Sequence, residues 1–181
     1  MGRKFGFGQP YGGVMQTAFV VEDIRESIAH FITNCHSGPF FLLDSFGDES
    51  HVYRGAVSQT KVTIAMGFVG SMQIELIQPL DHHPSIYRET IARRGYGFHH
   101  FGIGFEDCEA ELPAYLARGY EVAFTAPVPT GGSVYYLDNG KGAAEGFLEL
   151  IPANPAMDAH FTGYWQAAQD WDGKDPIRPF M

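Results

Sequence analysis

The chain lacks the features that would tie it to a membrane, to nucleic acid or to an oxidising compartment. Its 181 residues contain no apolar run near the roughly 20 residues that a membrane-spanning helix needs. Its 12 Lys and Arg, against 21 Asp and Glu, form no basic stripe. The two cysteines, Cys35 and Cys108, have neither metal spacing nor the density of a disulfide scaffold, so we expect reduced, buried thiols. These absences predict a cytoplasmic protein that binds neither nucleic acid nor a membrane.

The two ends of the chain differ in character from the rest. Residues 1–13 hold glycines and aromatics without the apolar core of a signal peptide, and we expect a loose N-terminal arm. Residues 154–181 form a C-terminal extension that contains both tryptophans, Trp165 and Trp171. Here we expect a helix from Pro155 to about Asp170 and then an irregular tail. Its aromatic residues favour a role in covering a sheet or a neighbouring subunit, as in a homodimer.

One sequence pattern occurs twice, at residues 16–23 and 100–107, which are 84 positions apart. After each copy, apolar residues follow an i, i+4, i+7, i+8 stripe that is typical of a helix packed on a sheet. These residues are Ile24, Ile28, Phe31 and Ile32 in the first copy and Cys108, Leu112, Tyr115 and Leu116 in the second. Asp23 and Asp107 stand where a helix N-cap belongs. The repeat therefore predicts two strand-helix units.

Three short runs rich in Val, Ile, Phe and Tyr follow each predicted helix, and they predict strands. They cover residues 39–43, 60–68 and 72–77 in the first half and 120–124, 133–137 and 147–151 in the second. Each half is thus a βαβββ module, at 14–79 and 98–153, joined by a linking helix within 80–97. The polar stretch 45–59 has no counterpart in the second half. It is either a lid over a pocket or a surface insertion.

Four polar residues stand alone among apolar neighbours in the predicted strands. They are Gln16, Glu75, His100 and Glu149. Burying a carboxylate costs several kcal/mol (about 3–5 when it is unpaired) unless a cation pairs with it, and no Lys or Arg occupies a matching strand position. A divalent metal ion is therefore the natural partner. His99 should point to the opposite face of its strand from His100, so only His100 can enter the cavity.

These modules, the two strand-to-helix joints ending in Glu-Asp, the two Glu-Leu-Ile segments and the sequence from Gly95 to His100 resemble the vicinal oxygen chelate superfamily. The branch they resemble contains the glyoxalases, bleomycin resistance proteins and methylmalonyl-CoA epimerases. The resemblance covers residues 14–153 and implies an α+β domain in which duplicated βαβββ modules form a curved mixed sheet around a central cavity. It also implies Gln16, Glu75, His100 and Glu149 as metal ligands. Gln16 departs from the His often found at its position, although some glyoxalases use this Gln, Glu, His, Glu set.

The mostly oxygen ligand set suits Zn, Ni, Co, Mn, Fe or Mg acting as a Lewis acid, and the resemblance implies Glu149 as the catalytic base. The stretch 60–68 lacks the acid of the two-base epimerases. We therefore expect a lyase or isomerase that transfers a proton on a small oxygenated substrate, with aromatic compounds and thioesters among the candidates.

Two other functions stay open at this stage. The first is a non-catalytic, drug-sequestering type of small-molecule binder, and the second is an extradiol-type dioxygenase, whose ligand set fits this chain poorly. The strand aromatics, which are Phe40, Phe41, Phe68, Tyr135 and Tyr136, line the cavity or fill the core. The sequence leaves open whether the two modules close within one chain or across a dimer.

Overall fold

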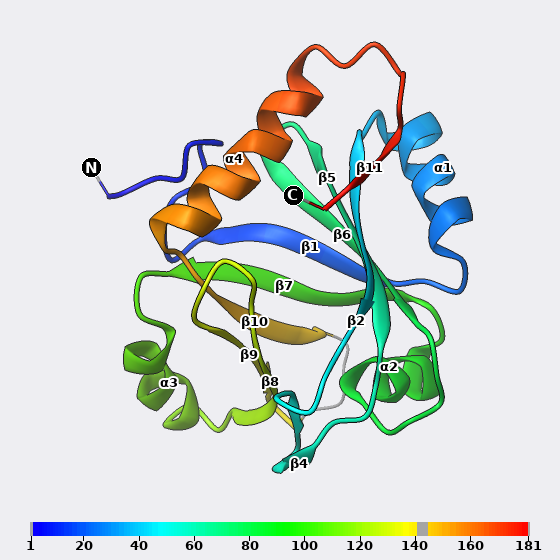
Figure 1. Cartoon of the computed structure of the whole chain (residues 1–181). Helices are drawn as coiled ribbons and strands as arrows, with labels where there is room; N and C mark the ends of the chain where they lie inside the picture. Colours follow the sequence, from blue (N-terminus) through cyan, green and yellow to red (C-terminus); the bar gives the residue numbers. More distant parts are fainter. Residues whose placement is uncertain (1, 141–144, 181) are drawn as a thin grey trace.

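The computed structural model, drawn in Figure 1, describes residues 2–140 and 145–180. Met1 and Met181, the outer ends of the predicted arm and extension, lie outside the described residues. One mixed sheet carries the described strands in the order β11-β2-β5-β6-β1-β7-β10-β9-β8-β3-β4. Helices α1, α2 and α3 lie around the outside of the curved sheet, whereas α4 crosses its other side (Figure 1). The predicted α+β class with a curved mixed sheet is confirmed.

Both predicted modules are present. Module one consists of β1 (Val14–Val20), α1 (Ile24–Cys35), β2 (Phe40–Phe46), β5 (Val62–Val69) and β6 (Met72–Pro79). Module two consists of β7 (Gly97–Phe105), α3 (Cys108–Leu116), β8 (Glu121–Pro127), β9 (Ser133–Asp138) and β10 (Phe147–Pro152). As predicted, Asp23 and Asp107 cap α1 and α3, accepting hydrogen bonds from backbone N–H groups of the first turn. The linking helix α2 (Ile86–Arg94) is capped by Ser85.

The two modules meet within a single chain at the centre of the sheet. β1 pairs with β7 in the antiparallel sense, and each of these strands pairs in parallel with the last strand of its own module. Ala18 lies opposite Glu75 in module one, and its repeat equivalent Gly102 lies opposite Glu149 in module two. The two halves therefore use the same strand register, and the question left open by the sequence is answered for this chain. The predicted homodimer stays a prediction.

A bulge interrupts β7 beside the centre of the sheet. Ala18 on β1 faces His100, but the next residue, Phe19, faces Phe98, so His99 is left as an extra residue. Such a bulge breaks the alternation of side chains along a strand. As a result the His99 ring lies 5.1 Å from the His100 ring, and His99 is fully buried. The prediction that His99 and His100 point to opposite faces is wrong for this reason.

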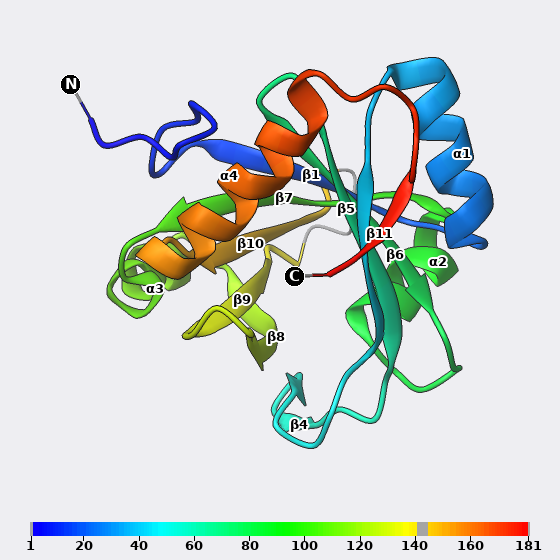
Figure 2. The ribbon, with the colours of Figure 1, turned by 45° about the horizontal axis from the view of Figure 1, so that its top comes forward.

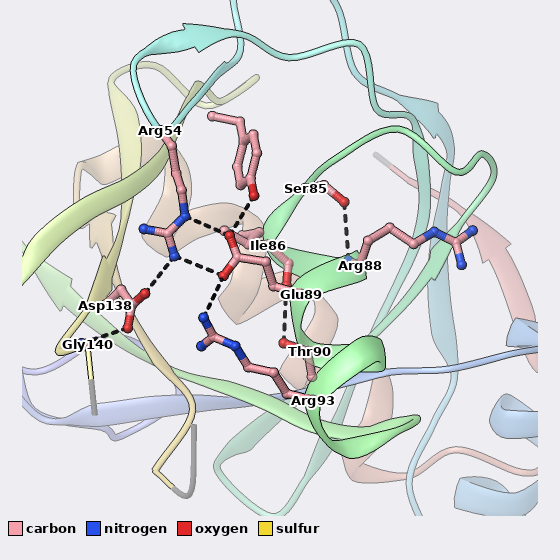
Figure 3. Close-up of polar contacts among 10 residues, drawn as sticks. Arg54, Ser85, Ile86, Arg88, Glu89, Thr90, Arg93, Asp138 and Gly140 are labelled. Carbon is pink, nitrogen blue, oxygen red and sulfur yellow. Dashed lines mark hydrogen bonds and ion pairs between the residues drawn. The ribbon is translucent and has the colours of Figure 1, made fainter. Parts of the chain in front are cut away.

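The stretch 45–59 forms a short hairpin of β3 (Val52–Tyr53) and β4 (Ala56–Val57). β3 pairs with β8, so an insertion from module one extends the sheet of module two, and Figure 2 shows it below the gap between the two halves. Arg54 in the hairpin turn binds Glu89 of α2 and Asp138 of β9, with N···O distances of 2.6 Å to each (Figure 3). This insertion is therefore anchored to both the linking helix and module two.

The N-terminal arm is packed against the domain, so the prediction of a loose arm is wrong. Phe5 and Phe7 are 2% and 1% exposed, and the Phe7 ring lies 5.3 Å from that of Phe68. The backbone N–H of Gly6 donates a 2.8 Å hydrogen bond to Asp158 on α4. Gly104 makes room for this packing, because a Cβ there would lie 2.4 Å from the Phe5 ring. The aromatic residues of the arm are the physical reason, since burying each ring contributes about 2–3 kcal/mol.

The C-terminal extension forms α4 (Pro155–Gln169), as predicted, and then a strand that was not predicted. β11 (Ile177–Pro179) pairs in parallel with β2, so the expectation of an irregular tail is wrong there. Pro179 is tolerated because β11 is the outermost strand of the sheet. Among the described residues, no helix combines the length and apolar character needed to cross a membrane.

The two cysteines have different environments. Cys108 is buried at the start of α3, where burial raises the pKa of its thiol to about 12. Cys35, the last residue of α1, is exposed. The prediction of two buried thiols is therefore correct for Cys108 and wrong for Cys35, because α1 ends at the surface one residue before a left-handed cap at His36.

Candidate metal centre

Four adjacent strands in the middle of the sheet bring the four predicted site residues together. β6, β1, β7 and β10 supply Glu75, Gln16, His100 and Glu149, respectively. Their exposed fractions are 3%, 1%, 0% and 5%. Each module contributes one residue from its first strand and one from its last strand. The cluster therefore lies on the line where the two modules join.

The Nε2 atom of His100 is the centre of this cluster. It lies 3.0 Å from Gln16 Oε1, 3.0 Å from Glu149 Oε2 and 3.4 Å from Glu75 Oε2. One ligand atom each from Glu75, His100 and Glu149 lies within 4.8 Å of the other two. Metal bonds of about 2.0–2.2 Å to N and O ligands require donor atoms at this kind of separation. The three residues are thus placed as a group that could hold a metal ion, with Gln16 beside them.

The hydrogen bonding of the two carboxylates is incomplete. Glu75 Oε2 and Glu149 Oε2 are buried, and among the described residues neither has a hydrogen-bond partner of acceptable geometry, although both lie close to His100 Nε2. A single imidazole nitrogen cannot donate to three surrounding oxygens. An unpaired buried carboxylate oxygen is costly, and a cation at this position would satisfy both acids. The residues present therefore fit a divalent ion.

The electrostatics of the cluster support this fit. Burial, and next the negative charge of Glu149, raise the pKa of Glu75 well above its usual range. Two carboxylates this close in an apolar site cannot both ionise without a cation. In the ion-free protein Glu75 therefore holds a proton, which a bound divalent ion would displace.

His99 contacts the far side of the His100 ring. The two Nδ1 atoms are 2.8 Å apart, so one of them donates a hydrogen bond to the other. Burial and the neighbouring His100 ring lower the pKa of His99 well below its usual range, which keeps His99 neutral. For His100 to present a free Nε2 to a metal, its Nδ1 must carry the hydrogen and donate it to His99. Sequence reasoning missed this contact because it depends on the bulge in β7.

The cluster borders a cavity that opens to solvent and is lined mainly by side chains of the two modules. Gln16, Glu75 and Glu149 line it, and Tyr87 and Tyr136 stand beside them. Burial, and then the nearby glutamates, raise the pKa of both tyrosines above 10, so their hydroxyl groups stay protonated and can donate hydrogen bonds. Tyr87 was not expected at the site, because its linking helix carries no motif that points to the cavity.

The remainder of the cavity wall is mainly apolar. It is formed by Leu43, Phe46, Ile64, Met66, Phe124, Ala126, Val128, Pro129, Thr130, Val134, Ile151, Met157, Phe161 and Phe180. Of the aromatic residues that the sequence placed near the cavity or core, only Tyr136 lines the cavity. Phe40, for example, packs with Ile24 and Ile28 under α1. The wall also contains no Lys or Arg from the described part of the chain.

Fold and site together define a protein of two joined βαβββ modules with a small-molecule cavity at their junction. The sequence of residues 15–136 matches the Glyoxalase/Bleomycin resistance protein/Dioxygenase superfamily, and the chain belongs to this family. This confirms the predicted family. The match ends before Glu149, so the assignment of Glu149 relies on the internal repeat and the geometry. A search among curated protein sequences finds no match for this chain.

Solved structures share the fold. A methylmalonyl-CoA epimerase from Mycobacterium tuberculosis gives a TM-score of 0.57 at 17% identity, over 81% of this chain and 91% of that one. A hypothetical protein from Bacillus halodurans C-125 gives 0.55 at 22% identity, over 76% and 91%. A methylmalonyl-CoA epimerase variant from Streptomyces coelicolor in complex with 2-nitronate-propionyl-CoA gives 0.53 at 15% identity, over 76% and 94%. At these identities the likeness establishes the fold alone.

Proposed function

We propose that this protein is a divalent-metal-dependent lyase or isomerase of the glyoxalase-like type, which moves a proton on a small oxygenated substrate. The observation that carries this proposal is the pair of buried carboxylates with unpaired oxygens around His100 Nε2, beside a cavity. Burying such carboxylates costs free energy of folding, and buried titratable groups of this kind cluster at functional sites.

Gln16, Glu75, His100 and Glu149 would hold the ion. Two carboxylates, one imidazole and one amide oxygen suit Zn, Ni, Co, Mn, Fe or Mg. A bound ion would supply a Lewis acid that polarises a substrate oxygen and acidifies the neighbouring C–H group. The family membership and the free carboxylate oxygens both support this ligand set.

Glu149 is the proposed proton acceptor. It lines the cavity, and resemblance to the glyoxalases favours it over Glu75. The neighbouring Tyr136 keeps its hydroxyl proton and can donate a hydrogen bond to a substrate oxygen or to Glu149. The residues that line the cavity from β5, Ile64 and Met66, are apolar, and Met66 lies directly opposite Glu75. Without an acid on β5 the site favours proton removal and return by one carboxylate over exchange at both faces of one carbon.

Deuterium exchange tests the proposal without knowledge of the natural product. Metal-loaded protein in D2O would be mixed with α-hydroxy ketones, α-keto hemithioacetals and methylmalonyl thioesters, and loss of the C–H signal followed by NMR. We expect exchange in at least one class, lost after chelation, restored by metal and slowed by at least about 10²-fold in Glu149→Gln. Exchange that persists after chelation, or that proceeds at the wild-type rate in the Glu149→Gln protein, would refute the proposed mechanism.

The mainly apolar cavity wall favours a second candidate function, a non-catalytic binder of an aromatic small molecule. That function requires neither the ion nor Glu149. A purified protein that binds aromatic ligands equally well with and without divalent ions, and exchanges no substrate proton, would support it.

A further inference from the structure

The C-terminal extension supplies part of the wall of the cavity. Met157 and Phe161 of α4, together with Phe180 beyond β11, line the same cavity as Gln16, Glu75 and Glu149. Met157 and Phe161 are only 1% and 6% exposed. In Figures 1 and 2, α4 crosses the side of the sheet away from α1, and the chain end returns beside β2. A segment outside the repeated modules and outside the family match thus bounds the candidate site.

The extension is fixed in this position. Tyr164 of α4 stacks on Phe41 of β2 with ring centroids 3.7 Å apart. The backbone N–H of Phe180 donates a 3.0 Å hydrogen bond to the carbonyl of Leu42, which continues the pairing of β11 with β2. The Phe180 ring also lies 4.8 Å from the ring of His160. Phe180 is therefore held at the cavity by backbone pairing as well as by ring contacts.

The charges along the cavity are one-sided. Two acids line it, whereas the rest of its wall is mainly apolar and, within the described residues, includes no Lys or Arg. An anionic group against this apolar wall would lose hydration without gaining a Lys or Arg counter-ion. An uncharged apolar or aromatic group would instead bury surface against Phe46, Phe161 and Phe180.

We propose that the portion of the ligand inside this cavity has an uncharged aromatic or apolar body next to its oxygen-bearing head. Phe161 and Phe180 of the extension are the residues that select this body. That the ligand is the substrate rests on the proposed function; the binding preference does not. The extension is then a specificity element that this chain adds to the repeated fold.

Two probes with the same ring system test the proposal, 2-naphthol and naphthalene-2-sulfonate. Calorimetric titration of the full-length protein, as purified and again after chelation, should show one 2-naphthol site per chain. The sulfonate should bind at least about 10-fold more weakly, a difference of about 1.4 kcal/mol. Phe180→Ala should weaken 2-naphthol binding by about 5–10-fold, and the milder Phe161→Leu by a smaller factor in the same direction.

Phe101→Ala is the matched control. Phe101 lies on the central strand β7, is 37% exposed and does not line the cavity, so its removal should leave binding unchanged. Failure of 2-naphthol to bind, equal or tighter binding of the sulfonate, or unchanged affinity in both Phe180→Ala and Phe161→Leu would overturn the inference. If the inference holds while no ion binds and no proton exchanges, the proposed function fails and the ligand preference stands.

Discussion

The two modules place their buried glutamates in the same way but differ in the segments that are added around them. Glu75 and Glu149 lie at the same register position, opposite Ala18 and its repeat equivalent Gly102. Around this common centre, module one carries an inserted hairpin that pairs with module two, and the C-terminal strand β11 pairs only with module one. The repeat therefore places the candidate ligands, and the C-terminal extension adds Met157, Phe161 and Phe180 to a cavity wall that the modules otherwise mostly form.

The comparison also explains why module one has an alanine, Ala18, where module two has a glycine, Gly102. Ala18 in module one is fully buried. At Gly102, its counterpart, a Cβ would lie 2.6 Å from Gln16 Oε1 and 2.8 Å from Ile151 Cδ1. The asymmetry follows from the side chains, because the space beside Gly102 is filled by the Gln16 amide. Glycine at this position lets Gln16 reach His100.

Replacing the two acids one at a time gives the largest expected effects. Glu75→Gln and Glu149→Gln should each weaken ion binding by more than about 10²-fold. Replacing a group that only hydrogen-bonds to a metal ligand already costs about 10–100-fold in metal affinity. At saturating ion, Glu75→Gln should recover much of the proton exchange. Glu149→Gln should stay about 10²–10⁴-fold slower, the usual contribution of a general base. Calorimetry and deuterium exchange measure the two quantities.

Glu121→Gln, on the exposed start of β8, serves as the control and should match the wild type in both measurements. Equal recovery of exchange by Glu75→Gln and Glu149→Gln would show that Glu149 is not the base. Unchanged ion affinity in both would remove the ligand role of the two acids.

The next largest effect should come from Gly102→Ala. The new Cβ would displace the Gln16 amide, so ion affinity should fall by about 10-fold, as for other changes that disturb a ligand's position. Overpacking should also lower the free energy of unfolding by about 1–3 kcal/mol. Ion titration and urea unfolding measure both changes.

Gly163→Ala in α4 is the matched glycine control. A Cβ at Gly163 meets no atom within 4 Å, so this helix substitution should raise stability by about 0.5–1 kcal/mol and leave ion binding unchanged. If Gly102→Ala binds the ion as tightly as the wild type, Gln16 has no part in holding it.

A moderate effect is expected at the hairpin, where Arg54→Ala leaves Glu89 and Asp138 without their shared cation (Figure 3). Hydrogen bonds to charged groups contribute about 1.5–3 kcal/mol each, and solvent screening at the partly exposed Arg54 lowers this, so we expect a net loss of about 1–3 kcal/mol in urea unfolding. Arg3→Ala removes an exposed ion pair with Glu106 and should cost about 0–1 kcal/mol. Equal losses in the two variants would show that the hairpin is not anchored through Arg54.

The subtlest difference should be in the response to pH. For Glu89, burial raises the pKa, but hydrogen bonds from Arg54 and Tyr53 outweigh it and leave the pKa below 4.5. This contribution to stability is present above the unfolded pKa and lost as pH falls through the folded one. Glu75 has the opposite sign: its raised pKa means that the ion-free protein loses stability as pH rises above 4.5.

Urea unfolding at a series of pH values from 4 upward isolates the contribution of Glu75 to stability. After chelation, the wild type should lose stability with rising pH by at most about 1.4 kcal/mol per unit relative to Glu75→Gln, because one proton is involved. A bound divalent ion should abolish the difference. Parallel curves for the chelated wild type and Glu75→Gln would contradict the raised pKa of Glu75.

Local sequence patterns predicted the helices and buried acids that recur in the two modules. The stripes after Asp23 and Asp107, and the lone acids Glu75 and Glu149, are visible because a helix stripe and a polar residue in an apolar strand are short-range patterns. The ligand roles of these residues stay predictions, but their placement in one buried cluster is a property of the structure.

What the sequence did not predict depends on contacts between distant segments. The bulge at His99 arises from pairing with β1, and the burial of Phe5 depends on space beside Gly104. Strand β11 exists because β2 offers an open edge, and Pro179 by itself suggested the opposite. Tyr87 reaches the cavity from α2, which packs against β1 and β7, and no periodicity in a short linking helix could reveal this.

Ion titration of the chelator-treated protein tests the central claim most directly. Calorimetry with Zn²⁺, Ni²⁺, Co²⁺ and Mn²⁺, repeated in two buffers of different ionisation enthalpy, reports stoichiometry, affinity and protons released. We predict one ion per chain for at least one metal, with a Kd below about 1 µM, release of the Glu75 proton, and an affinity at least about 100-fold weaker in His100→Ala. No binding by any of the four ions, or equal binding by His100→Ala, would contradict the account.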